Sequence, residues 1–297
     1  MNLKTITIFT PVYNRKKEII HLYESLVRQT NKDFIWIVVD DGSTDNVFNI
    51  LNKWKNENKI QMLIIRQENG GKHRAHNKGV QLCNTPWFIC VDSDDYLADN
   101  AVEIMHSEIS TLDDNDIGVI FAKFKLNVGM PNRWFNNGEK VNVSDIALRF
   151  GHIIETALLF RTNLLKTNLF PEIDGERFLG EEILYNKLQQ FGRMKASDKV
   201  IYFFSYLENG LTNHTFYVWK NNPQGVLLVL CSRYETLKKA DARLLAKGKA
   251  LIKCIMNINA ICLATGKSIG KFSPNKAMSF ILFFPSLIFK EIRYGKN

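Results

Sequence analysis

The sequence predicts an α/β protein with a mostly parallel sheet flanked by helices, and three observations support this prediction. Short apolar runs alternate with helical patterns at roughly 25-residue spacing over the first 110 residues. The second and fourth of these runs are continuously apolar, which is typical of strands buried on both faces. Each run also ends in a polar loop. Alternation of this kind predicts βαβ units, whose right-handed crossovers place all the loops on one edge of the sheet.

The expected elements can be read in order. The predicted strands cover residues 6–9, 34–39, 60–65 and the run that begins at Trp87. The predicted helices cover residues 18–29, a segment with Val47, Leu51 and Trp54 on one face, a short segment after Gly71, and residues 100–109. Ser43 or Thr44 is expected to cap the second helix.

The pattern changes after residue 110. Residues 117–125 and 200–206 read as strands, residues 181–191 and 223–264 as helical, and residues 153–160 as either strand or helix. We therefore predict a catalytic domain over residues 1–215, with a ligand-binding half (1–110) and a second half (111–215). A helical C-terminal region would follow over residues 216–297.

Composition narrows the class of protein. The chain has 297 residues and a net charge of +9, which favours acidic partners such as phosphate-bearing ligands or an anionic membrane. Lys and Arg are dispersed without a nucleic-acid-binding motif, so nucleic acid is not an expected partner. Five cysteines without a CxxC pair favour a reducing cytosol. We expect no signal peptide and no apolar run of the ~20 residues that span a bilayer.

Three carboxylates follow the fourth predicted strand within four positions: Asp92, Asp94 and Asp95. Hard cations such as Mg²⁺ or Mn²⁺ prefer oxygen ligands and are often held by one or two carboxylates plus substrate phosphates. The alternative is a turn or a helix cap rich in Asp and Ser, which needs no ligand.

Two other loops carry chemistry. Asp40 and Asp41 leave the second strand together, where a carboxylate can accept from a base or a ribose, although a helix cap needs only one of them. Gly70 and Gly71 allow backbone to approach a ligand, and basic side chains follow at Lys72, His73, Arg74 and His76. A solvated helix face is the alternative for the basic run. Neither a P-loop nor a GxGxxG fingerprint is present, which disfavours ATPases and NAD enzymes.

Together the four loops resemble the N-terminal half of family 2 glycosyltransferases, which have the Rossmann-like GT-A fold. They read TPVYN (10–14), DDGSTD (40–45), NGGKHRAHN (69–77) and DSDD (92–95), and the resemblance covers about residues 5 to 105. It implies a nucleotide-sugar donor, most often a UDP-sugar, inversion at the anomeric carbon and a Mg²⁺ or Mn²⁺ cofactor.

The resemblance also implies roles for single residues. The nucleoside pocket would contain Thr10, Pro11 and Tyr13, with Tyr13 near the base. Asp41 would read the uracil ring with Asp40 beside it. Gly71, Lys72 and Asn77 would belong to the donor-binding loop. Asp92, Ser93 and Asp94 would form the DxD motif, with Asp94 the direct metal ligand and Asp92 directed toward ribose and metal.

A carboxylate base is expected at Glu181 or Glu182. Family members often have a Glu-Asp pair here and use its Asp, so Glu-Glu is a departure that leaves the choice open. Lys187, six positions after Glu181, matches a basic residue that often follows the base, which favours Glu181. Two glutamates favoured by a helix N-terminus are the alternative. Residues 207–214 resemble a segment of some bacterial members, and His214 is expected to be a surface histidine rather than a metal ligand.

The apolar segment 277–289 contains Pro285 and is followed by Lys290, Arg293 and Lys296. It fits either an interfacial anchor or a helix packed on the catalytic domain. The sequence thus predicts a cytoplasmic, metal-dependent glycosyltransferase that acts on a glycan or a lipid-linked saccharide acceptor. The anchor would place it peripherally on the anionic inner face of the membrane. A catalytically inactive nucleotide-sugar-binding module is the alternative function.

Overall fold

The computed structural model describes residues 4–151, 154–206 and 214–295. The chain divides into two compact units. The first consists of residues 1–143, 154–171 and 188–205, and the second of residues 144–153, 172–187 and 206–297. Each unit has its own buried apolar core. The expected domain boundary at residue 215 stays a prediction.

An eight-stranded sheet forms the centre of the first unit, with the strand order β3-β2-β1-β4-β9-β6-β10-β8. The first four run parallel, which confirms the predicted βαβ units. They are β1 (Ile6–Val12), β2 (Phe34–Asp40), β3 (Met62–Arg66) and β4 (Trp87–Cys90). The ambiguous segment near residue 155 is a strand, β9 (Thr156–Arg161), antiparallel to β4 and to β6 (Asp116–Ala122).

The remaining strands extend and flank this sheet. β10 (Arg193–Ser197) runs parallel to β6, and β8 (Lys140–Val141) pairs antiparallel at the edge. A second sheet joins β5 (Tyr96–Leu97), β11 (Tyr202–Phe204) and β7 (Phe124–Lys125). This small sheet places Tyr202 against the segment that follows β4, which matters for the site.

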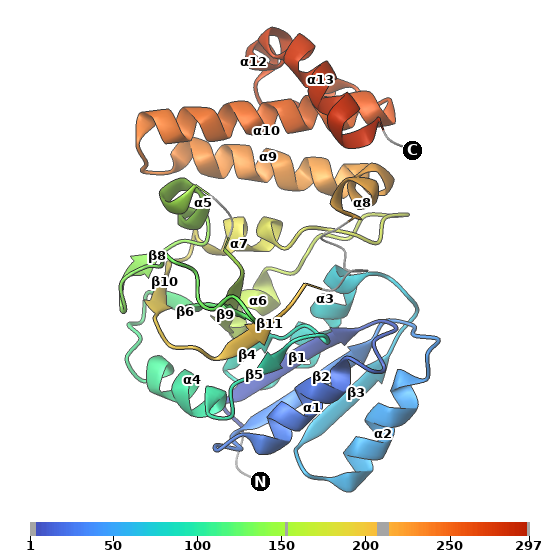
Figure 1. Cartoon of the computed structure of the whole chain (residues 1–297), viewed down its shortest axis with the longest axis vertical. Helices are drawn as coiled ribbons and strands as arrows, with labels where there is room; N and C mark the ends of the chain where they lie inside the picture. Colours follow the sequence, from blue (N-terminus) through green and yellow to red (C-terminus); the bar gives the residue numbers. More distant parts are fainter. Residues whose placement is uncertain (1–3, 152–153, 207–213, 296–297) are drawn as a thin grey trace. The chain divides into compact units, whose positions relative to one another are not determined.

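Helices cover both faces of the main sheet. They are α1 (Ile19–Arg28), α2 (Val47–Glu57), α3 (Lys72–Leu82), α4 (Ala101–Ile109) and α6 (Thr162–Thr167). Figure 1 shows α1 and α2 in front of β1 to β3. Between them Tyr23 stacks on Trp54 with ring centroids 4.1 Å apart, and Trp36 lies beside both. This aromatic stack fixes the helices that precede and follow β2.

The start of α2 differs from the expectation. The residue before the helix is Asn46, in the left-handed region at φ 64°, and the Asp45 carboxylate accepts from the Val47 amide at 3.1 Å. Neither Ser43 nor Thr44 caps the helix, so that prediction was wrong. Ser43 Oγ accepts from the Asn14 amide at 2.9 Å instead, which ties the loop after β1 to the loop after β2.

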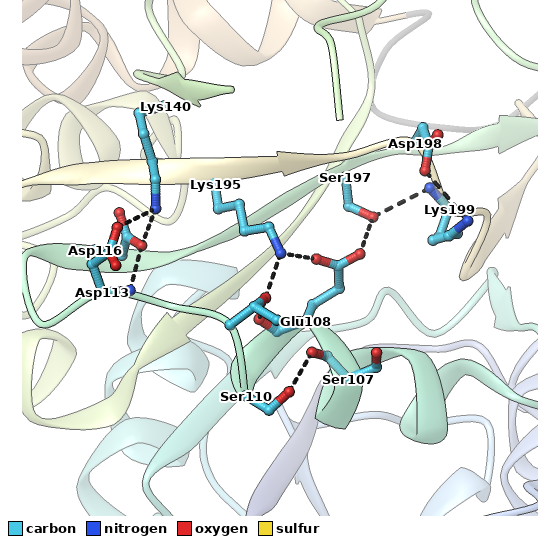
Figure 2. Close-up of polar contacts among 11 residues, drawn as sticks. Ser107, Glu108, Ser110, Asp113, Asp116, Lys140, Lys195, Ser197, Asp198 and Lys199 are labelled. Atoms are coloured by element: carbon cyan, nitrogen blue, oxygen red, sulfur yellow. Dashed lines mark hydrogen bonds and ion pairs between the residues drawn. The ribbon is translucent and has the colours of Figure 1, made fainter. Parts of the chain in front are cut away.

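A polar network fastens β10 to α4. Glu108 Oε2 lies 2.6 Å from Lys195 Nζ, and Ser197 Oγ donates to Glu108 Oε1 at 2.8 Å, as Figure 2 shows. Lys140 pairs with Asp116 and Asp113 nearby. Glu108 and Lys195 are both largely buried, so water solvates neither charge and each residue neutralises the charge of the other.

Glu108→Gln should therefore destabilise the first unit. The substitution keeps the side-chain shape but leaves the Lys195 ammonium without its counter-charge, at a cost of about 2–4 kcal/mol in the free energy of unfolding. Urea unfolding measures the difference. Asp99→Asn is the matched control, since it removes the exposed Arg28–Asp99 pair and should cost less than about 1 kcal/mol. Equal effects of the two substitutions would contradict the argument.

The second unit is helical. Its elements are α5 (Asp145–Phe150), α7 (Glu182–Leu188), α8 (Thr215–Asn221), α9 (Pro223–Lys239), α10 (Leu244–Thr265), α11 (Ile269–Phe272), α12 (Lys276–Ile281) and α13 (Phe283–Tyr294). α10 packs against α9 on one side and against α12 and α13 on the other (Figure 1). The predicted helical stretch 223–264 is confirmed as two helices.

Among the described residues, α10 alone is long and apolar enough to cross a membrane. The apolar runs of the sequence predicted no such segment. In its most apolar window 44% of the residues are buried in the protein, and Cys254, Ile255, Ile258 and Ile261 belong to the core of the unit. A single helix of this kind is weak evidence for a span, because the core helix of a helical unit has the same composition.

Candidate functional site

The four polar loops at the carboxyl ends of β1 to β4 are joined by hydrogen bonds. Asn14 binds Ser43, and Asn14 Oδ1 also accepts from the Thr44 amide at 2.8 Å. Asp41 binds the backbone of the loop after β3, and Lys72 in α3 binds Asp92 after β4. The expected gathering of these loops at one edge of the sheet is thus observed.

Asp41 holds the glycine pair. Its Oδ1 accepts from the Gly70 amide at 2.9 Å and from Gln67 Nε2 at 2.8 Å, and its Oδ2 accepts from the Gly71 amide at 2.7 Å. Gly71 has a φ of 92°, a conformation that glycine adopts at least cost. The carboxylate is buried and has about four acceptor positions, so one is left for a ligand.

Asp40 is fully buried and fastens the end of β2. Its Oδ1 accepts from the Ser43 amide at 2.9 Å, and Arg66 Nε lies 3.4 Å from its Oδ2. The Arg66 guanidinium also donates to the Ser43 carbonyl at 2.7 Å. Asp40 therefore shapes the loop that carries Asp41.

The carboxylates after β4 meet two lysines. Lys72 Nζ lies 2.5 Å from Asp92 Oδ1, and the nearly buried Lys123 Nζ lies 3.5 Å from Asp92 Oδ2 and 3.4 Å from Asp95 Oδ2. The Tyr202 hydroxyl accepts from the Asp92 amide at 2.9 Å and donates to Asp95 Oδ2 at 2.8 Å. Lys123 also lies 3.9 Å from the centre of the Tyr202 ring. Tyr202 of the second sheet and Lys123, which lies between β6 and β7, thus fix the DSDD loop.

Charge is unevenly balanced in this loop. Burial alone would raise the pKa of Asp92, but Lys72 and Lys123 outweigh it and hold that pKa well below its usual range. Burial, and then the Asp92 charge, raises the pKa of Asp94. Burial raises the pKa of Asp95 to about 7, although Lys123 opposes the rise. Negative charge on Asp94 is therefore poorly compensated by the chain itself.

The donor set fits a divalent cation that is completed by a ligand. Among the described residues no group of three or more His, Cys, Asp and Glu side chains could enclose a metal. Asp92 and Asp94 supply carboxylate oxygens one residue apart, and hard cations commonly take one or two carboxylates and complete their shell with phosphate oxygens and water. The raised pKa of Asp94 indicates that an added positive charge beside this carboxyl would be stabilising.

Lys123→Met should destabilise the fold in a pH-dependent way. Without this cation, the buried Asp95 carboxylate keeps the repulsion of Asp92 and loses its positive partner, and the free energy of unfolding should fall by about 3–5 kcal/mol near neutral pH. Burial and repulsion would then hold the pKa of Asp95 above that of the unfolded chain, so the folded state binds more protons. The deficit should therefore shrink as the pH is lowered from about 8 to about 5.

Urea unfolding at both pH values measures this deficit. Lys166→Met, which removes an exposed lysine from α6, is the matched control and should have little effect. A deficit that does not change with pH would mean that Lys123 acts by packing alone.

Other expected pocket residues are placed differently. Thr10 is buried and its Oγ1 accepts from Trp36 Nε1 at 3.0 Å, whereas Tyr13 is 49% exposed. Asn77 exchanges two hydrogen bonds with the Phe170 backbone, at 2.9 and 2.8 Å. Pro11 is half-buried and Ser93 is buried. Because the polar groups of Thr10 and Asn77 bind the protein itself, we leave these two residues out of the proposed ligand contacts.

Of the basic run, Lys72 contacts the carboxylates through Asp92. His73 is buried, and His76 packs edge-on against Phe9, Phe88 and Phe170. Arg74 donates to the Gly70 carbonyl at 2.9 Å and so supports the turn. The expectation that His76 supplies a donor to a diphosphate stays a prediction, and its ring lies within an aromatic cluster.

The two base candidates belong to the second unit and differ in their partners. Arg233 Nε lies 2.8 and 2.9 Å from the two Glu182 oxygens, and its terminal nitrogen also contacts Glu182. Burial lowers the pKa of Arg233, but Glu182 outweighs this and raises it. Glu181 Oε2 accepts from the Tyr185 hydroxyl at 2.8 Å. Glu182 is therefore committed to an ion pair with α9.

His214 is exposed, and residues 207–213 lie outside the described part of the chain.

Sequence reasoning missed several residues that organise these sites, among them Lys123, Tyr202, Gln67 and Arg233. A lysine at the end of an apolar strand was a weak signal for Lys123, since burying a lysine requires a partner. Nothing in the sequence pattern marked the other three.

Comparison with known proteins decides the family. The family model described as "Glycosyl transferase family 2" matches residues 7–169, more than half of the chain. The chain belongs to this family. The match begins in β1 and includes all four loops described above.

Two relatives of this family 2 member come from bacteria. Glycosyltransferase GlyG of Streptococcus pneumoniae is 33% identical over 110 residues, which cover 36% of each protein. Poly(ribitol-phosphate) beta-N-acetylglucosaminyltransferase TarS of Staphylococcus aureus is 29% identical over 175 residues, or 56% of this chain and 29% of TarS. The matched region therefore spans about a third of the length of these relatives.

Solved structures support the GT-A architecture. The structure of S. aureus TarS 1-349 in complex with UDP-GlcNAc has a TM-score of 0.65 at 22% identity and covers 98% of this chain and 81% of that one. Mannosyltransferase PcManGT from Pyrobaculum calidifontis in complex with GDP-Man and Mn²⁺ has a TM-score of 0.56 at 16% identity and covers 97% and 83%. The predicted fold, a mostly parallel sheet flanked by helices with a helical C-terminal part, is confirmed.

Proposed function

We propose that this chain is an inverting glycosyltransferase that moves a sugar from a nucleotide-sugar, with UDP as the expected nucleotide, to a hydroxyl of a glycan or a lipid-linked saccharide. Family membership supports the reaction class, and the relative TarS has been solved with UDP-GlcNAc. The observation that carries the proposal is the junction of Asp41, the Gly70–Gly71 turn, Lys72 and Asp92 at one sheet edge. The expected division into a donor half (1–110) and an acceptor half (111–215) belongs to the same proposal.

The donor would bind along this edge. Tyr13 and the remaining acceptor position of Asp41 suit the base, and the backbone of Gly71 allows close approach of the ligand. Lys72 suits the diphosphate as a cationic donor, for which it would exchange its contact with Asp92. Asp92 and Asp94 would hold Mg²⁺ or Mn²⁺. When bound, that ion would offset the charge that develops on the departing diphosphate.

Inversion requires a base opposite the leaving group. The acceptor oxygen forms a bond to the anomeric carbon while the carbon–phosphate-oxygen bond breaks, and the nucleoside diphosphate leaves with the electron pair. The hydroxyl proton passes to a carboxylate. We assign this role to Glu181, because Glu182 is held by Arg233. A general base must contact the acceptor hydroxyl, and the Glu182 carboxylate is occupied by Arg233.

Isothermal titration of UDP-, GDP- and dTDP-sugars in the presence of Mn²⁺ tests the proposal, followed by an assay of nucleoside diphosphate release with an acceptor panel. We expect UDP-sugars to bind most tightly and UDP release to require the metal. Tight GDP-sugar binding without UDP-sugar binding would overturn the role of Asp41. Binding without turnover on every acceptor would support an inactive nucleotide-sugar-binding module instead.

A further inference from the structure

The solvent-facing side of the last two helices is apolar. Five large side chains form this terminal apolar stripe: Phe280 (84% exposed), Ile281 (74%), Phe284 (75%), Ile288 (65%) and Ile292 (70%). Residues 284, 288 and 292 follow the four-residue spacing that places side chains on one helix face. Exposed apolar side chains are common singly, but a continuous row of this kind marks an interaction surface.

The opposite side of the same helices is firmly packed. Ser279, Ser286 and Tyr294 are buried against the unit. Asn259 of α10 donates to the Ser279 carbonyl at 2.9 Å and to Ser286 Oγ at 3.2 Å. Asn275 Oδ1 accepts from the Met278 amide at 3.0 Å and so caps α12. Turning the stripe inward would break these buried hydrogen bonds, so its outward orientation is a fixed feature of the unit.

The positive charge of the chain is concentrated in the C-terminal region that contains the stripe. Residues 216–297 contain 14 of the 39 Lys and Arg but only 3 of the 30 Asp and Glu, a net charge of +11. Residues 1–215 carry a net charge of −2. The helices that bear the stripe also contain Lys276, Lys290 and Arg293, and their one acidic residue, Glu291, is paired with Lys290 at 2.8 Å. The partner that complements an apolar row within a strongly cationic region has a surface that is both apolar and anionic.

We propose that the terminal apolar stripe docks onto an anionic lipid bilayer and that the chain lies on it as a peripheral protein. The stripe would enter the boundary between headgroups and acyl chains, and the surrounding lysines would face lipid phosphates. One-sided burial fits a helix that lies on a membrane and does not fit one that crosses it. A second copy of the chain is the less favourable partner, because two regions of charge +11 would repel each other.

Co-sedimentation of the full chain with vesicles tests this proposal. We expect binding to equimolar phosphatidylcholine–phosphatidylglycerol vesicles and little binding to phosphatidylcholine alone. Phe284→Ser combined with Ile288→Ser should lower the partition coefficient by about tenfold or more. Lys271→Gln combined with Lys276→Gln should lower it a few-fold, only on the anionic vesicles and less at high salt.

Val128→Ser is the matched control, since Val128 is equally exposed but lies in the first unit. It should bind vesicles like the unaltered chain. UDP-sugar titration of each variant tests the proposed function separately. Donor affinity should be unchanged in every variant, because no residue of the stripe is among the proposed donor contacts. The proposal is overturned if the unaltered chain binds no vesicles or if the serine variant binds as well as it does. It is also overturned if sedimentation velocity finds a dimer that the serine substitutions dissociate, because the stripe then serves a second copy.

Discussion

Asp94→Asn should lower metal-dependent UDP release by about 100- to 1,000-fold, the loss expected when one group that offsets charge in the transition state is removed. Asparagine keeps the shape of the side chain and loses its charge. Asp94 differs from Asp92 because two lysines already pair with Asp92, whereas burial and the Asp92 charge raise the pKa of Asp94. The effect on Mn²⁺ affinity should therefore be larger for Asp94→Asn than for a substitution at an exposed acid.

The measurement combines UDP release with titration of Mn²⁺ in the presence of UDP, so that metal binding is read independently of turnover. Asp114→Asn, at an exposed acid of the same unit, is the control and should leave both unchanged. Unaltered thermal unfolding would show that the substitution does not act through the fold. Full turnover by Asp94→Asn would remove this residue from the proposed metal site.

Much of the fold could be predicted because its signals are local. The runs that form β2 and β4 are almost entirely apolar, and each is followed by a loop whose residues need no distant partner to be recognised. β9 could not be assigned, since a short run buried on both faces has the same pattern as a buried helix segment. Its antiparallel place between β4 and β6 depends on pairings that one sequence does not display.

The location of the site could be predicted from the sequence, but the partners of its side chains could not. The residue types of the four loops indicated where ligand chemistry lies, but they did not indicate which side chains the protein uses for itself. Thr10 and Asn77 look polar and available in the sequence, yet Trp36 and Phe170 occupy their hydrogen-bonding groups. Lys123 is 28 positions from its partner Asp95, and Tyr202 is 107 positions away from it. Such partners follow from tertiary structure and not from spacing.

Substitution of the adjacent glutamates should separate catalysis from stability. Glu181→Gln should lower the rate of sugar transfer by about 100- to 10,000-fold, the usual contribution of a general base, with UDP-sugar affinity and the free energy of unfolding nearly unchanged. Glu182→Gln should have the opposite profile. It leaves the Arg233 guanidinium without its counter-charge and should cost about 1–3 kcal/mol of stability, with a smaller effect on the rate.

Each glutamate thus serves as the control for the other, since the two substitutions are chemically identical and one residue apart. Transfer rates at saturating donor and acceptor, together with urea unfolding, give both readouts. Arg233→Met should reproduce the stability loss of Glu182→Gln and keep the rate, because it breaks the same ion pair from α9. A large loss of rate in Glu182→Gln with none in Glu181→Gln would reassign the base to Glu182. The bidentate contact with Arg233 would then be an interaction that the enzyme must release before it binds acceptor.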